Sequence, residues 1–337
     1  MKIALDAMGG DIAPKNPIGG LKLALKSLPQ VEKFYLTGPS DVLEAELDLQ
    51  KISDRSRIEI VHAPQIVEMS DSGLDAVRKK KHSSITVAVD LVKQGECQAV
   101  VSAGHTGASV TAGTLMLGRL SGVDFPGIAS PMPNEHGVCY LLDAGANPDA
   151  SPQHLVQYAI MGSVYAQYVH GKASPVVGLM NVGEEDTKGN SLSKETFALL
   201  KHAPINFRGN VEGHDIFETE LDVIVCDGFT GNVILKSCEA TAKAMFKWLK
   251  HEIEASFVRK MGAFLAKDAF RTIKKRGSYE SYGGSPLLGV RGVVIIGHGS
   301  SSAVAIMNAL RVGVEAVAHE VNPHIQNAIT SHAFSHV

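Results

Sequence analysis

Six short loops in this sequence carry the residue types that bind anions. In each loop an apolar run ends at Asp, Asn, Ser or Gly and enters a polar segment that contains glycine. The segments are LDAMGGD from Leu5, VSAGHTG from Val101, LLDAGANPD from Leu141, LMNVGEED from Leu179, VCDGFTGN from Val225 and IGHGSSS from Ile296. Glycine lets backbone N–H groups approach a ligand, and the amino ends of helices attract negative charge. The repetition predicts a phosphate-handling crevice, built from strand ends that meet at one edge of a sheet.

The candidate residues come from these loops and from their neighbours in the sequence. Side chains able to hold a charge or move a proton are His105, Lys188, Asn190 and His298. Residues able to seat phosphate or substrate are Asp6, Gly9, Gly10, Asp11, Ser102, Thr106, Asp143, Asn147, Asn181, Gly183, Asp227, Thr230, Gly231, Asn232, Gly283 and Gly284. For each of them a helix cap, a tight turn or a buried polar contact is the alternative role. The acidic run at residues 184–186 lacks EF-hand spacing, so no metal site is predicted.

Other catalytic signatures are missing from the sequence. It has no GxSxG elbow, no Walker A lysine motif, no HExxH, and no GxGxxG after the first strand. This argues against the hydrolase, NTPase, zincin and dinucleotide-binding classes. Cys226 is a candidate nucleophile, but the carboxylate of the adjacent Asp227 raises the pKa of a thiol. We therefore expect Cys226 to be a buried strand residue.

The elements that must position these loops alternate between strand and helix. Most strand candidates are followed by helical patterns, which predicts an α/β fold with a mostly parallel sheet flanked by helices. Residues 126–143 instead hold two strand candidates around a turn at residues 134–137, which predicts an antiparallel excursion. A helix is expected from about Pro152 to His170. The strand candidates lie near residues 2–5, 33–37, 57–62, 98–102, 138–143, 175–180, 205–208, 222–226 and 292–296.

Residues 237–276 form a basic amphipathic arm in the predicted organisation. They carry ten Lys or Arg against four acids, with apolar residues at three- and four-residue spacing and an expected helix break at Gly262. Two interpretations stay open: a core-facing stripe with a solvated charged face, or a contact site for an acidic protein or an anionic membrane. The cations of that contact site are Lys243, Lys247, Lys250, Arg259, Lys260, Arg271, Lys274, Lys275 and Arg276.

Composition describes a globular protein of the reducing cytoplasm. Among 337 residues 45% are apolar and 20% charged, and a net charge of −3 argues against a nucleic-acid partner. The four cysteines lie far apart without CxxC pairing, and neither a signal peptide nor a transmembrane stretch is expected. The chain is predicted to form one large α/β unit over residues 1–320. This unit is either a single core or two intimately joined lobes with the active-site cleft between them, and a polar, frayed tail is expected at residues 321–337.

Several segments, taken together and in order, closely resemble the bacterial phosphate acyltransferase family. They are IALDAMGGDIAP, RKKKHSSI, SAGHTGA, LLDAGAN with HLVQYAIMGSVYA, NVGEEDTKGN, DGFTGNVILK, and SYGGSPLLGV with GHGSS, spread over residues 1 to about 320. The resemblance implies transfer of a long-chain fatty acyl group from acyl carrier protein to inorganic phosphate, without a nicotinamide or metal cofactor. It implies a fold similar to the phosphotransacetylase and isocitrate/isopropylmalate dehydrogenase group, a homodimer and peripheral membrane association. The acyl phosphate would serve a downstream glycerol-phosphate acyltransferase of phospholipid synthesis.

In such a reaction a phosphate oxygen attacks the thioester carbonyl and a thiolate leaves. A free thiol has a pKa of only about 8.5, so positioning and charge stabilisation should matter more than a strong base. We expect Lys188 and Asn190, with Asn181 and Gly183, to hold phosphate or the developing charge. His105 and Thr106 would donate near the carbonyl, and His298 is an alternative proton donor to the thiolate. The orienting groups would be Asp6, Asp143 and Asp227.

Three other functions remain open from the sequence. An acyl-coenzyme A phosphotransacetylase would share the crevice and the chemistry. A decarboxylating dehydrogenase-like enzyme would share the fold group, and a non-catalytic scaffold would recruit carrier protein to membranes.

Overall fold

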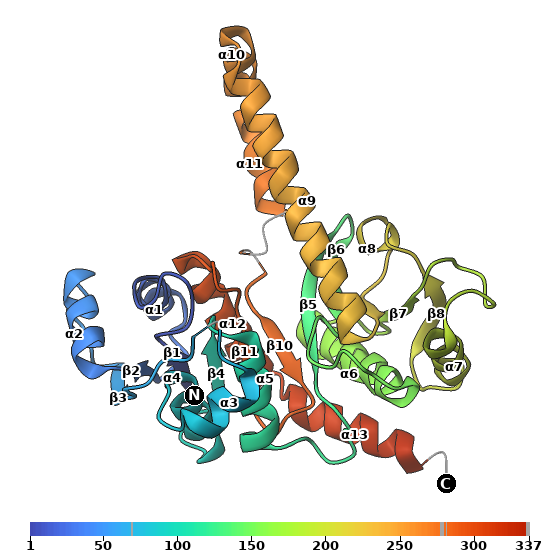
Figure 1. The fold of residues 1–337 in the computed structure, drawn as a ribbon, viewed down its shortest axis with the longest axis horizontal. Coiled ribbons are helices and arrows are strands. Elements are labelled where there is room, and N and C mark those ends of the chain that lie inside the picture. The colour runs from blue at the N-terminus through green and yellow to red at the C-terminus, as the bar shows by residue number, and fades with distance from the viewer. Residues whose placement is uncertain (69, 277–279, 281, 335–337) are drawn as a thin grey trace.

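A computed structural model of the chain describes residues 1–68, 70–276, 280 and 282–334, without the side chains of residues 274–276, 333 and 334. Its centre is one mixed sheet of eleven strands in the order β3-β2-β1-β4-β11-β10-β5-β6-β9-β7-β8, with helices on both faces (Figure 1). This confirms the predicted α/β fold with a mostly parallel sheet. The strands are β1 (Lys2–Asp6), β2 (Lys33–Gly38), β3 (Ile58–His62), β4 (Ala99–Ser102), β5 (Gly127–Asn134), β6 (Gly137–Leu142), β7 (Val176–Met180), β8 (Asn206–Val211), β9 (Val223–Val225), β10 (Ser285–Leu288) and β11 (Val293–Ile296).

The sheet joins two parallel halves that run in opposite directions. Strands β3, β2, β1, β4 and β11 are parallel to one another, and so are β6, β9, β7 and β8. Three successive antiparallel pairings, β11 with β10, β10 with β5, and β5 with β6, lie between the halves. Because this number of reversals is odd, the carboxyl ends of the two halves point to opposite edges of the sheet. The antiparallel excursion predicted at residues 126–143 is the β5–β6 hairpin.

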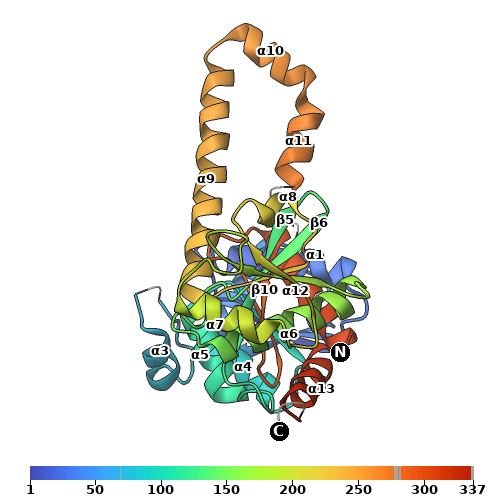
Figure 2. The ribbon, with the colours of Figure 1, turned by 90° about the vertical axis from the view of Figure 1, so that its right-hand side faces the viewer.

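Helices cover the two halves and define two lobes. Lobe one consists of the first parallel half with α1–α5 and α12, and lobe two of the second half with α6–α8, α13 and the base of α9 (Figures 1 and 2). The helices are α1 (Lys15–Ser27), α2 (Ser40–Leu49), α3 (Gly73–Lys79), α4 (Ser84–Lys93), α5 (Thr106–Ala112), α6 (Pro152–His170), α7 (Ser191–Leu200), α8 (Asp215–Glu218), α9 (Gly228–Glu254), α10 (Phe257–Leu265), α11 (Lys267–Arg276), α12 (Ala303–Ala318) and α13 (Val321–Phe334), with a π-helix at Gly113–Leu117. Within the described part of the chain, none of these helices has both the length and the apolar character required to cross a bilayer.

Local sequence accounts for the sharp helix starts. The Ser83 hydroxyl caps α4 by accepting from the Thr86 N–H. At α6 the Ser151 hydroxyl accepts from the His154 N–H, His154 accepts in return from the Ser151 N–H, and Pro152 occupies the first turn. This reciprocal cap fixes the helix at the predicted residues, and α6 then packs against α13, α7 and β9.

Two predicted features differ from the structure. The tail is not frayed where it is described, because α13 packs on α6 and buries Val321, Ile325 and Ile329. The i, i+4 spacing of these three apolar residues provides the packing stripe. Gly262 does not break the arm but lies inside α10, whereas the helices end at Glu254 and Leu265.

The arm is a helical projection that leaves the body of the molecule. Helix α9 starts at the sheet in lobe two and continues outward, α10 forms the tip, and α11 returns (Figures 1 and 2). α10 buries none of its residues. Of the two interpretations of residues 237–276, the exposed contact site therefore fits this geometry better than the core-facing stripe.

Candidate functional site

The loops after β1, β4 and β11 meet at one edge of lobe one. We call these residues, 6–11, 102–106 and 297–300, the first loop cluster. The Ser102 hydroxyl donates to Asp6 Oδ2 at 2.7 Å, and the Asp11 N–H donates to the Gly299 carbonyl at 2.8 Å. A cavity of about 260 Å³ opens here. Its lining includes Asp6, Met8, Gly9, Gly10, Asp11, Ile66, Val67, Glu68, Ser84, Ile85, Gly104 and His105.

Asp6 is a buried carboxylate at the floor of this cavity. Only 3% of the residue is exposed, and burial raises its pKa above the ordinary aspartate value. Hydrogen bonds from Ser102 and from the Met8 N–H oppose that shift. Gly9 permits this packing, because a Cβ there would lie 2.8 Å from both Asp6 Oδ2 and the Gly104 nitrogen. The backbone of the first loop therefore approaches the cavity as closely as glycine allows.

His105 caps α5 through its Nδ1, so its other ring nitrogen, Nε2, takes no part in the cap. Its Nδ1 accepts a hydrogen bond from the Ala108 N–H at 3.1 Å. An accepting Nδ1 carries no proton, so in the neutral ring the proton resides on Nε2. His105 lines the cavity, and Thr106 beside it is exposed. His105 therefore carries a hydrogen-bond donor in the lining of the cavity, and its predicted donation near the carbonyl stays a prediction.

An apolar part of the cavity lining was not predicted, and we call it the apolar wall. It consists of Ile66, Val67 and Ile85, next in sequence to the lining residues Glu68 and Ser84. Lys80 of the basic run holds this wall, since its Nζ donates to the Ile66 carbonyl at 3.0 Å and to Asp71 Oδ2 at 2.7 Å. The hydrogen bond from Lys80 lowers the pKa of Asp71. No local spacing indicates the wall, because its residues come from the connection before α3 and from α4.

Two candidates near the same edge have other surroundings. The His298 Nδ1 accepts from the Ser300 N–H at 3.1 Å, and its Nε2 lies 3.7 Å from Glu239 Oε2 of α9. Gly283 and Gly284 lie against α12 and β11, where a Cβ would come within 2.7 Å of the Asn308 carbonyl and 2.5 Å of Ile295 Cγ2 respectively. Their role in the structure is close packing of the segment that precedes β10.

The loops after β6, β7 and β9 form a second group in lobe two. We call these residues, 143–147, 181–190 and 227–232, the second loop cluster. Asp143 is fully buried and accepts hydrogen bonds from the backbone N–H groups of Ile128, Gly145, Ala146 and Asn147. Burial raises its pKa, and these hydrogen bonds oppose the shift. Its oxygens are therefore occupied in shaping the loop.

Other side chains of the second loop cluster cap helices or contact neighbouring side chains. Asp227 caps α9 by accepting from the Thr230 N–H and hydroxyl, and Asn190 caps α7 by accepting from the Ser193 N–H. The Asn147 amide contacts Tyr158 and His154. At Gly231 a Cβ would lie 1.9 Å from the Asp143 carbonyl oxygen, so only glycine fits.

The remaining members of this cluster lie nearer the solvent. The Asn181 amide donates to the Lys188 carbonyl, and Gly183 lies against the Lys188 side chain. Asn232 is exposed, and Lys188 is exposed. No ion pair of Lys188 occurs within the described residues.

The expectation that six strand ends meet at one edge is wrong. Opposite strand directions divide them into two groups of three. Twelve residues of α9 separate Asp227 from Glu239, which is about 18 Å at 1.5 Å per residue. Helix α9 nevertheless links the groups, since Leu235 packs with the cores of both lobes.

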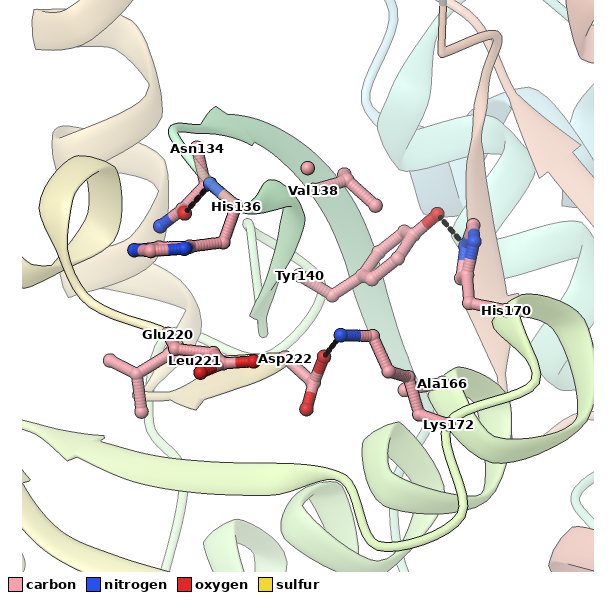
Figure 3. Close-up of a pocket in the computed structure, with 11 residues that line it drawn as sticks. Asn134, His136, Val138, Tyr140, Ala166, His170, Lys172, Glu220, Leu221 and Asp222 are labelled. Atoms are coloured by element: carbon pink, nitrogen blue, oxygen red, sulfur yellow. Dashed lines mark hydrogen bonds and ion pairs between the residues drawn. The ribbon is translucent and has the colours of Figure 1, made fainter.

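A second cavity, of about 180 Å³, lies at the far end of the β5–β6 hairpin (Figure 3). In it Tyr140 and His170 are hydrogen bonded at 2.7 Å, and Lys172 is paired with Asp222 at 3.2 Å. Burial lowers the pKa of His170. This cavity adjoins the amino ends of β6 and β9, whereas ligands of open α/β sheets bind at carboxyl ends. None of its lining residues was predicted, and we do not place the reaction here.

Cys226 is buried, as expected, but it lies one residue after β9 and not within the strand. Burial raises the pKa of its thiol, and the carboxylates of Asp143 and Asp227 add to that shift. Six arm cations are exposed: Lys243, Lys247, Lys250, Arg259, Lys260 and Arg271. The side chains of Lys274, Lys275 and Arg276 lie outside the described part of the structure.

Comparison with known proteins decides the family. The family described as "fatty acid synthesis protein" matches residues 1–324. A protein of Akkermansia muciniphila named phosphate acyltransferase is 56% identical over 97% of this chain and 95% of its own length. One of Pelotomaculum thermopropionicum with the same name is 47% identical over 98% and 96%. The chain belongs to the phosphate acyltransferase family. It is accordingly an acyltransferase.

Solved structures place the fold of this phosphate acyltransferase family member. A phosphotransacetylase from Streptococcus pyogenes aligns over 94% of both chains with a TM-score of 0.59 and 16% identity. A 4-hydroxythreonine-4-phosphate dehydrogenase from Salmonella typhimurium aligns over 93% of this chain and 98% of its own, with a TM-score of 0.53 and 12% identity. At this level of identity the likeness concerns the fold alone, and it confirms the predicted fold group.

Proposed function

We propose that this protein transfers a long-chain acyl group from an acyl carrier protein thioester to inorganic phosphate, with the reaction at the first loop cluster. The observation that carries the proposal is the near full-length identity to relatives named phosphate acyltransferase. The first loop cluster is preferred because it combines a cavity, glycine backbone and a histidine donor with an apolar wall. That wall suits the hydrocarbon next to a thioester.

The chemistry needs little from the protein beyond positioning. An oxygen of HPO₄²⁻ attacks the thioester carbon, a C–O bond forms, and the C–S bond then breaks. The phosphate proton ends on the departing sulfur, so the products are acyl phosphate and a free thiol. In this proposal His105 donates its Nε2–H to the developing oxyanion, which backbone N–H groups of the glycine loops also stabilise; the hydrogen bond that Nδ1 accepts supports a proton on Nε2.

Lys188 enters the proposal in a different role from the one expected at the start. The two loop clusters follow the carboxyl ends of oppositely directed halves of the sheet, so we do not expect one phosphate to contact both Lys188 and the cavity. We propose that Lys188 and the amino ends of α7 and α9 attract phosphate towards the cleft between the lobes.

The arm supplies the contact with the substrate carrier or the membrane. Phe257 and Val258 are 78% exposed and Leu265 is 83% exposed at its tip, next to exposed cations. We propose that this apolar and basic tip touches acyl carrier protein or an anionic membrane surface. A homodimer in the cytoplasm, and use of the acyl phosphate by a glycerol-phosphate acyltransferase, belong to the same proposal.

The decisive assay is incubation with palmitoyl carrier protein and radiolabelled phosphate. The expected product is a labile acyl phosphate that hydroxylamine traps as a hydroxamate. A parallel reaction with palmitoyl-coenzyme A separates the two thioester donors: faster turnover of the coenzyme A thioester would make the enzyme a phosphotransacetylase. No acyl phosphate from either donor would refute the proposal.

The only tryptophan of the chain, Trp248, reports on the arm directly. It is 66% exposed on α9 within the projecting part. A blue shift of its fluorescence is expected on adding either acyl carrier protein or anionic vesicles, and the partner that causes it is the one the arm contacts. Replacing Lys243, Lys247 and Lys250 by Glu should abolish the shift. Equal shifts in the wild type and in this triple variant would exclude a charge-dependent contact.

A further inference from the structure

The apolar wall of the first loop cluster changes from buried to exposed along its length. Ile85 is only 3% exposed and follows Ser84, which also lines the cavity. Val67 is half-buried, and Ile66 is 41% exposed. The wall therefore provides an apolar path from the interior of the cavity to the solvent.

The size of the cavity gives this path a use in the proposed reaction. Pockets that enclose a drug-sized ligand measure about 300–1,000 Å³, whereas this cavity measures about 260 Å³. Phosphate and the thioester group already fill part of that space. A long acyl chain must therefore leave the cavity, and it leaves most favourably along apolar side chains, because contact with them removes hydrocarbon from water.

The segment that carries the exposed end of the wall is fixed on both sides. At its start, Gln65 forms a parallel bridge with Ser83, directly before α4. Beyond its end, Gly73 at the start of α3 packs against Gly107 in the first turn of α5, where a Cβ on Gly73 would lie 2.5 Å from the Gly107 carbonyl. These contacts tie the segment to the two helices whose first residues or caps line the cavity.

Lys80 holds the middle of this segment. The other three residues of the basic run 78–81 are exposed, whereas Lys80 is half-buried. Its Nζ donates to the Ile66 carbonyl at 3.0 Å and to Asp71 Oδ2 at 2.7 Å, and the same Asp71 oxygen accepts from the Glu68 N–H at 2.8 Å. The ammonium group thus cross-links the backbone of the wall to a carboxylate of the same segment.

We propose that Ile66 and Val67 are specificity-determining residues that guide the acyl chain out of the cavity, and that Lys80 is a positioning residue that holds them in place. The inference rests on the proposed function and deepens it, since the occupant of the path is the hydrocarbon chain of the thioester donor. The alternative role of a lysine beside an anion site is phosphate binding. The two roles predict different kinetics.

The test compares acyl phosphate formation from palmitoyl and butyryl carrier protein. In Ile66→Ser the ratio of kcat/KM for palmitoyl to that for butyryl donor should fall about tenfold, because an apolar contact with the long chain is lost. Lys80→Met should lower the ratio in the same direction and leave the KM for phosphate unchanged. The matched control is Lys79→Met, whose side chain is 74% exposed and pairs with Asp75, and its ratio should stay that of wild type.

Asp71→Asn separates the two roles of Lys80. It removes the charge partner of Lys80, so a positioning role predicts a lower palmitoyl-to-butyryl ratio and an unchanged KM for phosphate. A phosphate-binding Lys80 would instead raise the KM for phosphate in Lys80→Met equally with both donors. That result, or a ratio within twofold of wild type in both Ile66→Ser and Lys80→Met, would overturn the inference. Thermal unfolding checks that each variant is folded at the assay temperature.

Photolabelling of the wild-type protein keeps the inference separate from the proposed function. The probe is a palmitic acid analogue with a photoreactive diazirine in its chain, and mass spectrometry locates the label. Label on Ile66 or Val67, reduced in Lys80→Met and retained in Lys79→Met, supports the path. Label confined to other segments refutes it whether or not the enzyme makes acyl phosphate. A labelled path in a protein that makes no acyl phosphate refutes only the proposed function.

Discussion

The first and second loop clusters have the same kind of sequence but differ in what their side chains are free to do. In the second, Asp143, Asp227 and Asn190 are occupied by backbone N–H groups of their own loops and helices. In the first, backbone and histidine groups surround a cavity with one apolar wall. Glycine-bearing loops at strand ends are common to both clusters, and the cavity between the loops of the first cluster is what favours it as the proposed reaction centre.

The largest effect should come from His105, which tests whether the first cluster is the centre. His105→Ala is expected to lower kcat by about 10²- to 10³-fold. It also removes the cap of α5, which should cost about 1 kcal/mol of stability. His105→Asn separates the two roles, because asparagine can still cap the helix but offers no Nε2–H. Steady-state kinetics and thermal unfolding of both variants measure this, and wild-type kcat in His105→Asn would remove His105 from the reaction.

Asp143 tests the scaffold role of the second cluster. In Asp143→Asn an amide N–H₂ group replaces one acceptor oxygen and leaves buried N–H groups without a partner. The free energy of unfolding should fall by about 2–4 kcal/mol, measured by urea unfolding, while the folded fraction retains kcat. Asp149→Asn, an exposed change in the same loop, is the control. A variant as stable as wild type but inactive would show that the Asp143 carboxylate acts on substrate.

Asp6, in the first cluster, can be tested through the pH dependence of the free energy of unfolding. Its pKa is raised in the folded state, so the native protein holds more protons than the unfolded chain, and stability falls as pH rises above about 4. Asp6→Asn has no such loss, and its stability relative to wild type should increase between pH 4 and 7. Asp54→Asn should show the opposite trend, because hydrogen bonds from Ser56 lower the pKa of Asp54. The stability of that variant relative to wild type should fall as pH rises over the same range. Parallel unfolding curves at all pH values would mean that Asp6 is not protonated more readily than an exposed aspartate.

The smallest effect is expected at Lys188. If it only attracts phosphate, Lys188→Ala should raise the KM for phosphate by up to about fivefold with kcat unchanged. The difference should vanish at high salt, because screening weakens the attraction of an exposed charge. Lys194→Ala is the control on the neighbouring helix. A large loss of kcat would instead place phosphate at Lys188 and move the reaction to the second cluster.

Most elements of this fold were predictable because their signals are local. The capped helix Pro152–His170 and the strand runs follow from periodicity, Pro and Ser placement, and apolar composition. The placement of the loops at two opposite edges of the sheet could not be predicted from such local signals. It depends on β10, a four-residue strand without a distinctive pattern, and on the odd number of antiparallel pairings around it.

The same contrast between local signals and contacts of distant segments holds for the candidate site. His105 and Asp6 both line the cavity, and their positions follow from local sequence, since Asp6 is the last residue of β1 and His105 lies in the loop after β4. The apolar wall with Ile66 and Ile85, and the contact of Glu239 with His298, arise from segments distant in sequence. Tertiary packing alone brings these residues together, so no spacing along the chain reveals them.

The arm is inserted between the lobes in the chain, since it begins at α9 in lobe two and its return leads to β10 and β11 in the middle of the sheet. The segment after the tip therefore carries the strands that fill the gap between β4 and β5. Cleavage of the backbone at Ser256 would divide the molecule into two fragments, of which the first lacks the two strands between β4 and β5 and the second holds only the β10–β11 pair. Such a protein should fold only by complementation of the two pieces, and the exposed tip is the natural place to split it into a reporter of assembly.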